Sequence, residues 1–105
     1  MRDRTELRAS ALHLAAFQGE IKMIRLLAEH GADMAVTTAS GVNALHMASQ
    51  GNSALGLNIL LYDYGGFDLN QTDNSGATAL IWAAFCGSEI SLAYLLAQPG
   101  IQVNL

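Results

Sequence analysis

The sequence predicts a mainly α-helical solenoid of stacked helix-turn-helix units that are joined by β-turns or hairpins. A heptapeptide occurs three times along the 105 residues, as SALHLAA from Ser10, NALHMAS from Asn43 and TALIWAA from Thr78. The copies begin 33 and then 35 residues apart, a spacing typical of repeat proteins whose units pack on one another. We therefore expect one domain with units of roughly 5–37, 38–72 and 73–105.

Each copy of the heptapeptide has the features of a short helix with a defined start and end. Its first residue is a small polar one whose side chain can accept a hydrogen bond from the free N–H groups of a helix start. These predicted N-caps are Ser10, Asn43 and Thr78. Nine residues further on, Gly19, Asn52 and Gly87 tolerate positive φ and are predicted to end the helix.

A second helix follows in each unit, because apolar residues recur at helical spacing in 21–29, 54–63 and 89–98. We predict that these apolar residues form the core: Ile21, Ile24, Leu27 and Ala28; Leu55, Leu57, Leu60 and Leu61; Ile90, Leu92, Leu95 and Leu96. The second helices are followed by the turn signals His30-Gly31, Gly65-Gly66 and Pro99-Gly100. Gly41 and Gly76, two residues before the next N-cap, predict a β-turn or hairpin between units.

The pattern resembles the ankyrin repeat, which reads D-x-x-G-x-T-P-L-H-x-A-A-x-x-G before a Leu-rich helix and G-A-D-x-N. The resemblance covers residues 10–19, Leu26-Leu27 and 31–33 in the first unit, and 73–87, Leu95-Leu96 and Val103-Asn104 in the third. The departures are alanine in place of the family's proline at Ala11, Ala44 and Ala79, one extra residue between the helices of units two and three, and another near Gly65-Gly66. We expect a small loss of stability and an unchanged fold.

Composition narrows the classes of function. Charged residues make up 13% of the chain and hydrophobic residues 51%, and the net charge is −4. All five basic residues precede residue 34, so no basic cluster supports nucleic-acid binding. The single cysteine, Cys86, excludes an intrachain disulfide and a cysteine-rich zinc site, which favours an intracellular, cytoplasmic setting or the cytosolic part of a larger protein. We expect no cofactor, no metal and no direct membrane insertion.

Few residues could carry chemistry. His13 and His46 share one repeat position, where the third unit has Ile81, and the resemblance implies that this histidine bonds the backbone of the hairpin. The carboxylates Asp33 and Asp68 are repeat equivalents, and Asp73 matches the hairpin aspartate that bonds the turn backbone. Cys86 has no activating histidine in its own unit. A hydrolase or transferase that uses His13, His46 or Cys86 is therefore the third hypothesis, and we expect no enzyme.

The candidate binding surface follows from the resemblance, which implies that loop tips and the exposed sides of the first helices line a concave groove. Phe17 and Phe85 are the leading candidates, because large aromatic side chains at such positions are typical of interface anchors; the alternative is that both rings pack against neighbouring hairpins. We expect Trp82 to lie in the core with its indole N–H on a backbone acceptor. The complete set is Phe17, Gln18, Ala39, Ser40, Val42, Gln50, Gly51, Asn74, Ser75, Ala77, Phe85 and Cys86.

The function that these residues favour is non-catalytic binding of a partner protein, or of a neighbouring domain of the same chain, through the concave surface. The alternative is an architectural or spacer segment of a longer ankyrin-like array in a larger enzyme, membrane protein or scaffold. The apolar residues Ile90, Leu92, Tyr94 and Leu95 of the third unit indicate further repeats on the C-terminal side.

Overall fold

The computed structural model describes residues 4–103, and the side chains from residue 11 onward. The helices are α1 (Arg4–Gln18), α2 (Ile21–Glu29), α3 (Ala44–Gln50), α4 (Ala54–Asn58), α5 (Ala79–Cys86) and α6 (Glu89–Leu96), with a π-helical segment, η1 (Ile59–Tyr64), directly after α4. Within residues 4–103 there is no β-strand. The fold is the predicted solenoid of helix pairs.

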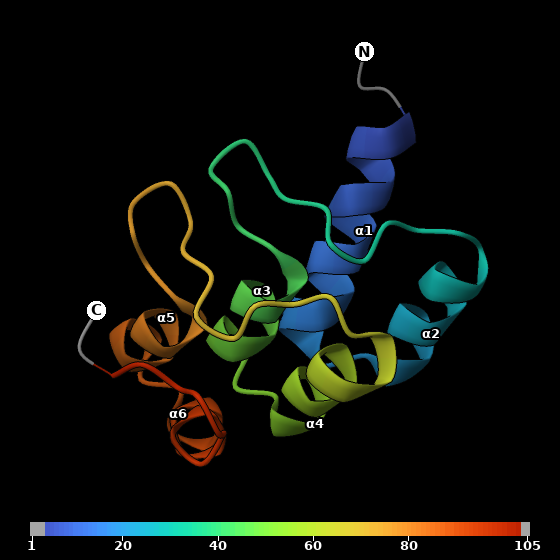
Figure 1. The fold of residues 1–105 in the computed structure, drawn as a ribbon. Coiled ribbons are helices and arrows are strands. Elements are labelled where there is room, and N and C mark those ends of the chain that lie inside the picture. Colours follow the sequence, from blue (N-terminus) through green and yellow to red (C-terminus); the bar gives the residue numbers. More distant parts are fainter. Residues whose placement is uncertain (1–3, 104–105) are drawn as a thin grey trace.

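The helices form two layers (Figure 1). The first helices α1, α3 and α5 lie side by side, and each packs on its neighbour in the row. The second helices α2, α4 with η1, and α6 pack against them from one side. The loops before α3 and α5 project from the same end of the stack (Figure 1), so the helices hold both loops in a fixed relation.

Two of the three predicted N-caps are confirmed. The Asn43 side chain accepts from the backbone N–H of His46 at 2.9 Å, and Thr78 Oγ1 accepts from that of Ile81 at 3.2 Å. The prediction for Ser10 is wrong, because α1 begins at Arg4 and places Ser10 within the helix. A local cap signal cannot exclude a helix that continues through it, since serine is tolerated within helices.

The predicted ends of the first helices are confirmed. Gly19, Asn52 and Gly87 have φ of 68°, 60° and 67°. Asn52 is the only non-glycine residue with positive φ in the described part of the chain. Asparagine tolerates this region better than other non-glycine residues, so the substitution keeps the geometry of the repeat.

The core follows the repeat. Leu12, Leu45 and Leu80 of the first helices are buried, together with Ile24, Leu57, Leu60 and Leu95 of the second helices. Ile21, Leu27, Leu61 and Leu92 pack against this cluster in part. The core prediction is wrong for Leu55, Ile90 and Leu96, which are exposed. Leu55 and Ile90 occupy the same repeat position, which faces solvent because no neighbouring helix covers it.

The extra residues of the 35-residue spacing lie at the end of the second unit. No extra residue separates the two helices of units two and three, contrary to the prediction: the positive-φ residue and the start of the next helix are two positions apart in every unit. The second helix of unit two instead continues as η1 to Tyr64 and then turns at Gly65 and Gly66, both with positive φ. A π-helical segment is a common way to accommodate an inserted residue without breaking a helix.

The predicted β-turns are present before α3 and α5. The backbone N–H of Gly41 donates to the Thr38 carbonyl at 2.9 Å, and that of Gly76 donates to the Asp73 carbonyl at 3.0 Å. Each loop is closed by a further bond, from the Thr38 N–H to the Val42 carbonyl and from the Asp73 N–H to the Ala77 carbonyl, both at 2.9 Å. We call residues 38–42 and 73–77 the second-unit turn and the third-unit turn. The Asn74 N–H donates to the Ser40 carbonyl at 2.9 Å, so the two turns are bonded to each other.

Candidate partner-binding surface

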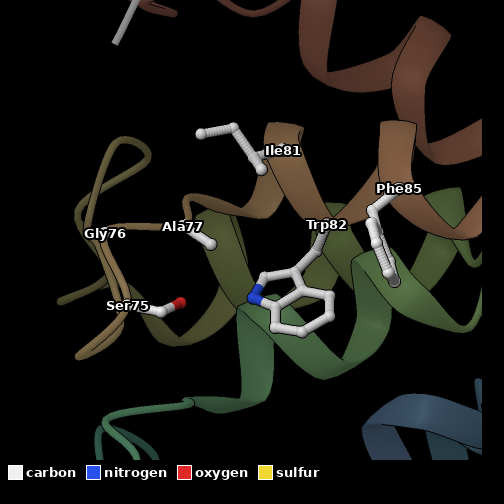
Figure 2. Close-up of a pocket in the computed structure, with 6 residues that line it drawn as sticks. All are labelled: Ser75, Gly76, Ala77, Ile81, Trp82 and Phe85. Atoms are coloured by element: carbon white, nitrogen blue, oxygen red, sulfur yellow. The ribbon is translucent and has the colours of Figure 1, made fainter.

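Phe85 is the most exposed large apolar residue of the predicted surface. Its side chain is 81% exposed, and its ring stands edge to face with Trp82, with the ring centroids 5.8 Å apart and the planes at 85°. Both residues come from α5, and in Figure 2 Trp82 lies between Phe85 and the third-unit turn. The edge-to-face contact orients the Phe85 ring while leaving most of it open to solvent.

Trp82 is held by a carboxylate. Its indole N–H donates to Asp73 Oδ2 at 2.8 Å, and the ring is half-buried. The prediction of a backbone acceptor is therefore wrong, because the Asp73 carboxylate at the start of the third-unit turn accepts this hydrogen bond. The core prediction for Trp82 is also wrong, since its ring lies outside the buried cluster. In Figure 2 the indole nitrogen points toward the turn that carries Ser75, so Trp82 joins the helix to the turn.

Asp73 organises the turn, as the resemblance implied. Its Oδ1 accepts from the backbone N–H groups of Ser75 and Ala77 at 2.9 and 3.0 Å, and from the Ser75 hydroxyl at 2.6 Å. Burial alone would raise the pKa of the Asp73 carboxyl, but the hydrogen bonds from Ser75, Ala77 and Trp82 outweigh it and lower the pKa from 3.8 to about 2. Asp73 is thus a charged, fully occupied structural acceptor near neutral pH.

A groove lies between the aromatic pair and the third-unit turn. Its volume is about 370 Å³, and it is lined by Ser75, Gly76, Ala77, Ile81, Trp82 and Phe85 (Figure 2). The lining is mainly apolar. Such a groove offers space for one or two apolar side chains of a partner.

A second groove, of about 560 Å³, lies between the two turns. It is lined by Ala39, Ser40, Val42, Asp73, Asn74, Ser75 and Trp82. The Asn74 side-chain amide donates to the Ala39 carbonyl at 2.9 Å and thereby fixes the distance between the turns. The predicted tip residues of units two and three therefore form one continuous surface with the aromatic groove, because Trp82 and Ser75 line both.

The remaining predicted residues differ in their surroundings. Phe17 is 42% exposed and Gln18 and Cys86 are exposed, whereas Gln50 is half-buried. Gly51 is half-buried against α1, and a Cβ built on it would lie 1.8 Å from the Phe17 carbonyl oxygen. Gly51 thus has a packing role between units one and two, and its place in a binding surface stays a prediction, as does that of the other residues.

Three residues of the aromatic groove, Gly76, Ile81 and Trp82, were not among the predicted site residues. Trp82 was assigned to the core. Ile81 replaces the repeat histidine, and Gly76 was assigned to the turn alone. The signal that could have indicated Ile81 is this replacement itself, since a unit without the histidine needs another contact between its first helix and its turn.

The histidines have the structural role that the resemblance implied. The His46 Nδ1 accepts from the Asn43 N–H at 3.1 Å, so its Nε2 must carry the proton that is donated to the Gln71 carbonyl at 2.9 Å. The His13 Nε2 lies 3.2 Å from the Val36 carbonyl. Burial lowers the pKa of His13, and the hydrogen bond to Val36 offsets part of this shift. Both ring nitrogens of His46 and the Nε2 of His13 thus make structural hydrogen bonds.

The described residues contain no group of three or more His, Cys, Asp or Glu side chains that could hold a metal ion. None of the helices in residues 4–103 is both long enough and apolar enough to cross a membrane.

Comparison with known proteins identifies the family. The family model for ankyrin repeats in three copies matches residues 12–105. The chain therefore belongs to the ankyrin repeat family.

Particular relatives share this fold and part of the sequence. Over 93 residues the chain is 40% identical to Palmitoyltransferase AKR1 of Lachancea kluyveri, which covers 87% of this chain and 13% of that protein. The human ASB11 ankyrin repeat domain superposes with a TM-score of 0.70 at 32% identity, covering 81% of this chain and 38% of the other. A chain of the complex between the endopeptidase Bd0816 and the immunity protein Bd3460 of Bdellovibrio bacteriovorus gives 0.71 at 25% identity, covering 82% and 44%. The chain thus spans a small part of the length of these relatives.

Proposed function

We propose that this chain is a non-catalytic protein-binding module that receives a partner protein, or a neighbouring domain of a longer chain, on its concave surface. The observation that carries the proposal is Phe85, a large aromatic ring that is 81% exposed, oriented by Trp82 and placed beside an apolar groove. Exposed aromatic residues in such positions are the usual anchors of protein interfaces. The acidic character of residues 34–105, with four acids and no base, favours a neutral or basic partner.

The absence of catalysis is part of the same proposal. His46 uses both ring nitrogens to hold the backbone, and His13 contacts the Val36 carbonyl through its Nε2, so both imidazoles have structural partners. Cys86 is exposed at the end of α5, where an exposed thiol without an activating base is a poor nucleophile. We also propose an intracellular setting, because the single cysteine excludes an intrachain disulfide.

A second candidate function is an architectural segment within a larger protein. It is favoured by the relative Palmitoyltransferase AKR1, in which the similarity spans only 13% of the protein. In that case the array would space or orient other domains, and the exposed aromatic ring would contact a neighbouring domain or no partner.

Affinity capture with matched variants tests the proposal. Extracts of the source cells are passed over immobilised chain carrying Phe85→Ala, Phe17→Ala or Leu55→Ala, and bound proteins are identified against the unmodified chain. Leu55 is the control, since it is apolar and 60% exposed but lies on a second helix, away from the groove. We expect Phe85→Ala to weaken one specific partner by about 30-fold or more, as for an interface hot spot, and Leu55→Ala to have no effect.

Thermal unfolding of the same variants separates binding from packing. An exposed ring contributes little to stability, so Phe85→Ala should leave the unfolding temperature nearly unchanged. A loss of about 3 kcal/mol or more, as for a buried phenylalanine, would show that the ring is part of the core and would contradict the proposal. Equal capture by all variants would favour the architectural function.

A further inference from the structure

We propose that Asn74 is a positioning residue of the candidate binding surface, which joins the second-unit turn and the third-unit turn into one recognition element. A partner that lies across both turns then depends on the bonds that Asn74 makes within the chain. This inference rests on the proposed function, because it concerns the same surface. It adds which residue sets the relation between the two halves of that surface.

Asn74 crosses from one turn to the other with two hydrogen bonds. Its backbone N–H donates to the Ser40 carbonyl at 2.9 Å, and its side-chain NH₂ group donates to the Ala39 carbonyl at 2.9 Å. The two acceptors are consecutive carbonyls at the tip of the second-unit turn. A single hydrogen bond leaves the two turns free to rotate about it, whereas two bonds from one residue fix both their distance and their orientation.

Gly41 leaves the space that this approach needs. A Cβ built on Gly41 would lie 2.6 Å from Asn74 Oδ1 and 3.0 Å from the Asn74 backbone nitrogen. Gly76 occupies the same position of the third-unit turn with a similar φ, 84° against 79°, but a Cβ built there meets no atom within 4 Å. Glycine is thus needed at both positions for the positive φ, and at Gly41 also for the contact with Asn74.

The shape of each turn does not depend on Asn74. Thr38 Oγ1 accepts from two backbone N–H groups of the second-unit turn at 3.2 Å, and the Asp73 carboxylate has the same role in the third-unit turn. Asn74 and Ala39 are exposed, and water can replace a hydrogen bond that is lost at an exposed position. The bonds of Asn74 should therefore contribute little to the stability of the chain and much to the placement of the turns.

The groove between the turns lies at this connection. Its volume is about 560 Å³, and both Ala39 and Asn74 line it. Ser75 and Trp82 line this groove and the aromatic groove, so the placement of the third-unit turn affects both. A surface that is already ordered in the free chain binds more tightly, because no ordering cost is subtracted from the binding energy. Asn74 thus affects binding even where the partner does not touch its side chain.

Amide exchange of the isotope-labelled chain, measured by NMR, tests the connection without a partner. Gly41→Ala places a methyl group against Asn74, and Gly76→Ala is the matched control, since it has the same strain at positive φ and no such contact. We expect Gly41→Ala to raise the exchange rate of the Asn74 N–H by about 10-fold or more, because the acceptor on the other turn is withdrawn. Gly76→Ala should leave this rate within about twofold of that in the unmodified chain.

Partner capture from cell extracts with Asn74→Ala, Gly41→Ala and the double variant tests the role in binding. Gly41 lines neither groove, so its substitution reaches a partner only through Asn74 and the turns. We expect each single variant to weaken by about 10-fold the partner whose capture depends on Phe85, and the double variant to weaken it no further, because both changes break one connection. Separate contacts with the partner would multiply to about 100-fold. The unfolding temperature of Asn74→Ala should be nearly unchanged.

Three results would overturn the positioning role. The first is an Asn74 exchange rate that rises equally, or not at all, in Gly41→Ala and Gly76→Ala. The second is a double variant whose effect is the product of the two single effects, since Asn74 would then act by contacting the partner. The third is full capture by Asn74→Ala of a partner that depends on Phe85, and the proposed function would then stand without this role.

Two further outcomes are also decisive. If no captured protein depends on Phe85, the proposed function fails and the positioning role fails with it. If Gly41→Ala is unfolded, Asn74→Asp takes its place, because it keeps the size of the side chain and turns a carboxylate oxygen toward the Ala39 carbonyl. The repulsion between the two oxygens should raise the exchange rate of the residue's own N–H by about 10-fold, and an unchanged rate would contradict the connection.

Discussion

The two interfaces within the stack are built differently. Units one and two meet through a close approach of α1 and α3, where Gly51 leaves space for the carbonyl of Phe17. An ion pair between Arg25 and Asp63, at 3.0 Å, crosses the outer edge of this interface. Close backbone contact depends on the absence of a side chain, so this interface is sensitive to size.

Units two and three meet through hydrogen bonds. The hydroxyl of Ser49 donates to the Ala79 carbonyl at 2.6 Å, and that of Ser88 donates to the Gln50 carbonyl at 3.0 Å. The Asn52 side chain accepts from the N–H groups of Ile90 and Ser91 at 2.9 and 3.1 Å, so unit two caps the helix of unit three. Further polar contacts join Asn58 to Tyr94, Tyr62 to Gln98, and Asn70 to Gly100 and Gln102.

The difference between the two interfaces shows that units of one repeat pattern can pack on each other in two ways. Dispersion contacts at a close approach require a small residue, whereas hydrogen bonds require matched donors and acceptors and fix the register of the units. Substitutions at the two interfaces should therefore fail for different reasons.

The largest effect is expected at the close approach. Gly51→Ala places a Cβ against the Phe17 carbonyl, although the φ of −79° at this position suits alanine. The substitution should lower the free energy of unfolding by about 3 kcal/mol, as for an overpacked core. Urea unfolding measures this loss. Cys86→Ala, at the same repeat position, should be nearly neutral; equal effects at both positions would contradict the difference between the interfaces.

Asp73→Asn should have the next largest effect, because it breaks the contact that replaces the repeat histidine in unit three. The amide cannot accept from all the donors around it, and its NH₂ group would face the indole N–H of Trp82. We expect a loss of about 2 kcal/mol, as for a hydrogen bond to a charged group.

The Asp73 carboxylate also makes the stability of unit three depend on pH in the acidic range. The pKa of Asp73 is lowered from 3.8 to about 2, so its contribution to stability is complete above about pH 4 and is lost as the pH falls through 2. Trp82 fluorescence, followed from pH 5 to pH 1.5, should report this loss. An emission that does not change before the whole chain unfolds would contradict it.

Asn52→Gly should cost about 1 kcal/mol, since glycine keeps the positive φ and removes only the acceptor that caps α6. Asn52→Ala should cost about 1 kcal/mol more, because alanine is strained at positive φ. Thermal unfolding of both variants separates the cap from the backbone effect. An unchanged Asn52→Gly protein would show that the hydrogen bonds between units two and three do not stabilise the stack.

Ser91→Ala should raise the free energy of unfolding by about 1 kcal/mol. The Ser91 hydroxyl is buried and has no hydrogen-bond partner among the described residues, and such a group costs its desolvation energy. Ser49→Ala, which removes a hydroxyl that does have a partner, should lower stability by a similar amount. If both serine variants lose stability equally, Ser91 must have a hydrogen-bond partner in solution.

Arg25→Ala should have the smallest effect, about 0.5 kcal/mol or less, because both partners of this ion pair are about half exposed. The effect should vanish in 0.5 M salt, which screens exposed charges. A larger loss that persists in salt would mean that the first interface also depends on polar contacts.

Much of the fold could be predicted from individual residues of the sequence. The positive-φ positions Gly19, Asn52 and Gly87, the caps at Asn43 and Thr78, and the histidine bonds were predicted, because each depends on a short segment or on the repeat pattern. The extent of α1 and the π-helical segment were not, since both depend on how a helix continues against its neighbours.

The candidate binding surface could be predicted from the sequence only in part. The sequence indicated the exposed positions of Phe17 and Phe85, but not the contact between Trp82 and Asp73, which links a helix to a turn nine residues earlier. Several acceptors compete for the indole N–H at that sequence separation, and only the packed turn selects one of them.

The sequence by itself determined the family, the number of units and the chemistry at each repeat position, because each of these depends on short segments that occur in all three units. Only the tertiary structure decided which faces are open and how each pair of units is joined. Ile59 and Leu26 occupy the same repeat position, but Ile59 is buried and Leu26 is exposed. The reason is that a helix pair packs over Ile59 and none packs over Leu26. Burial is a property of the stack, so no single unit of the sequence contains it.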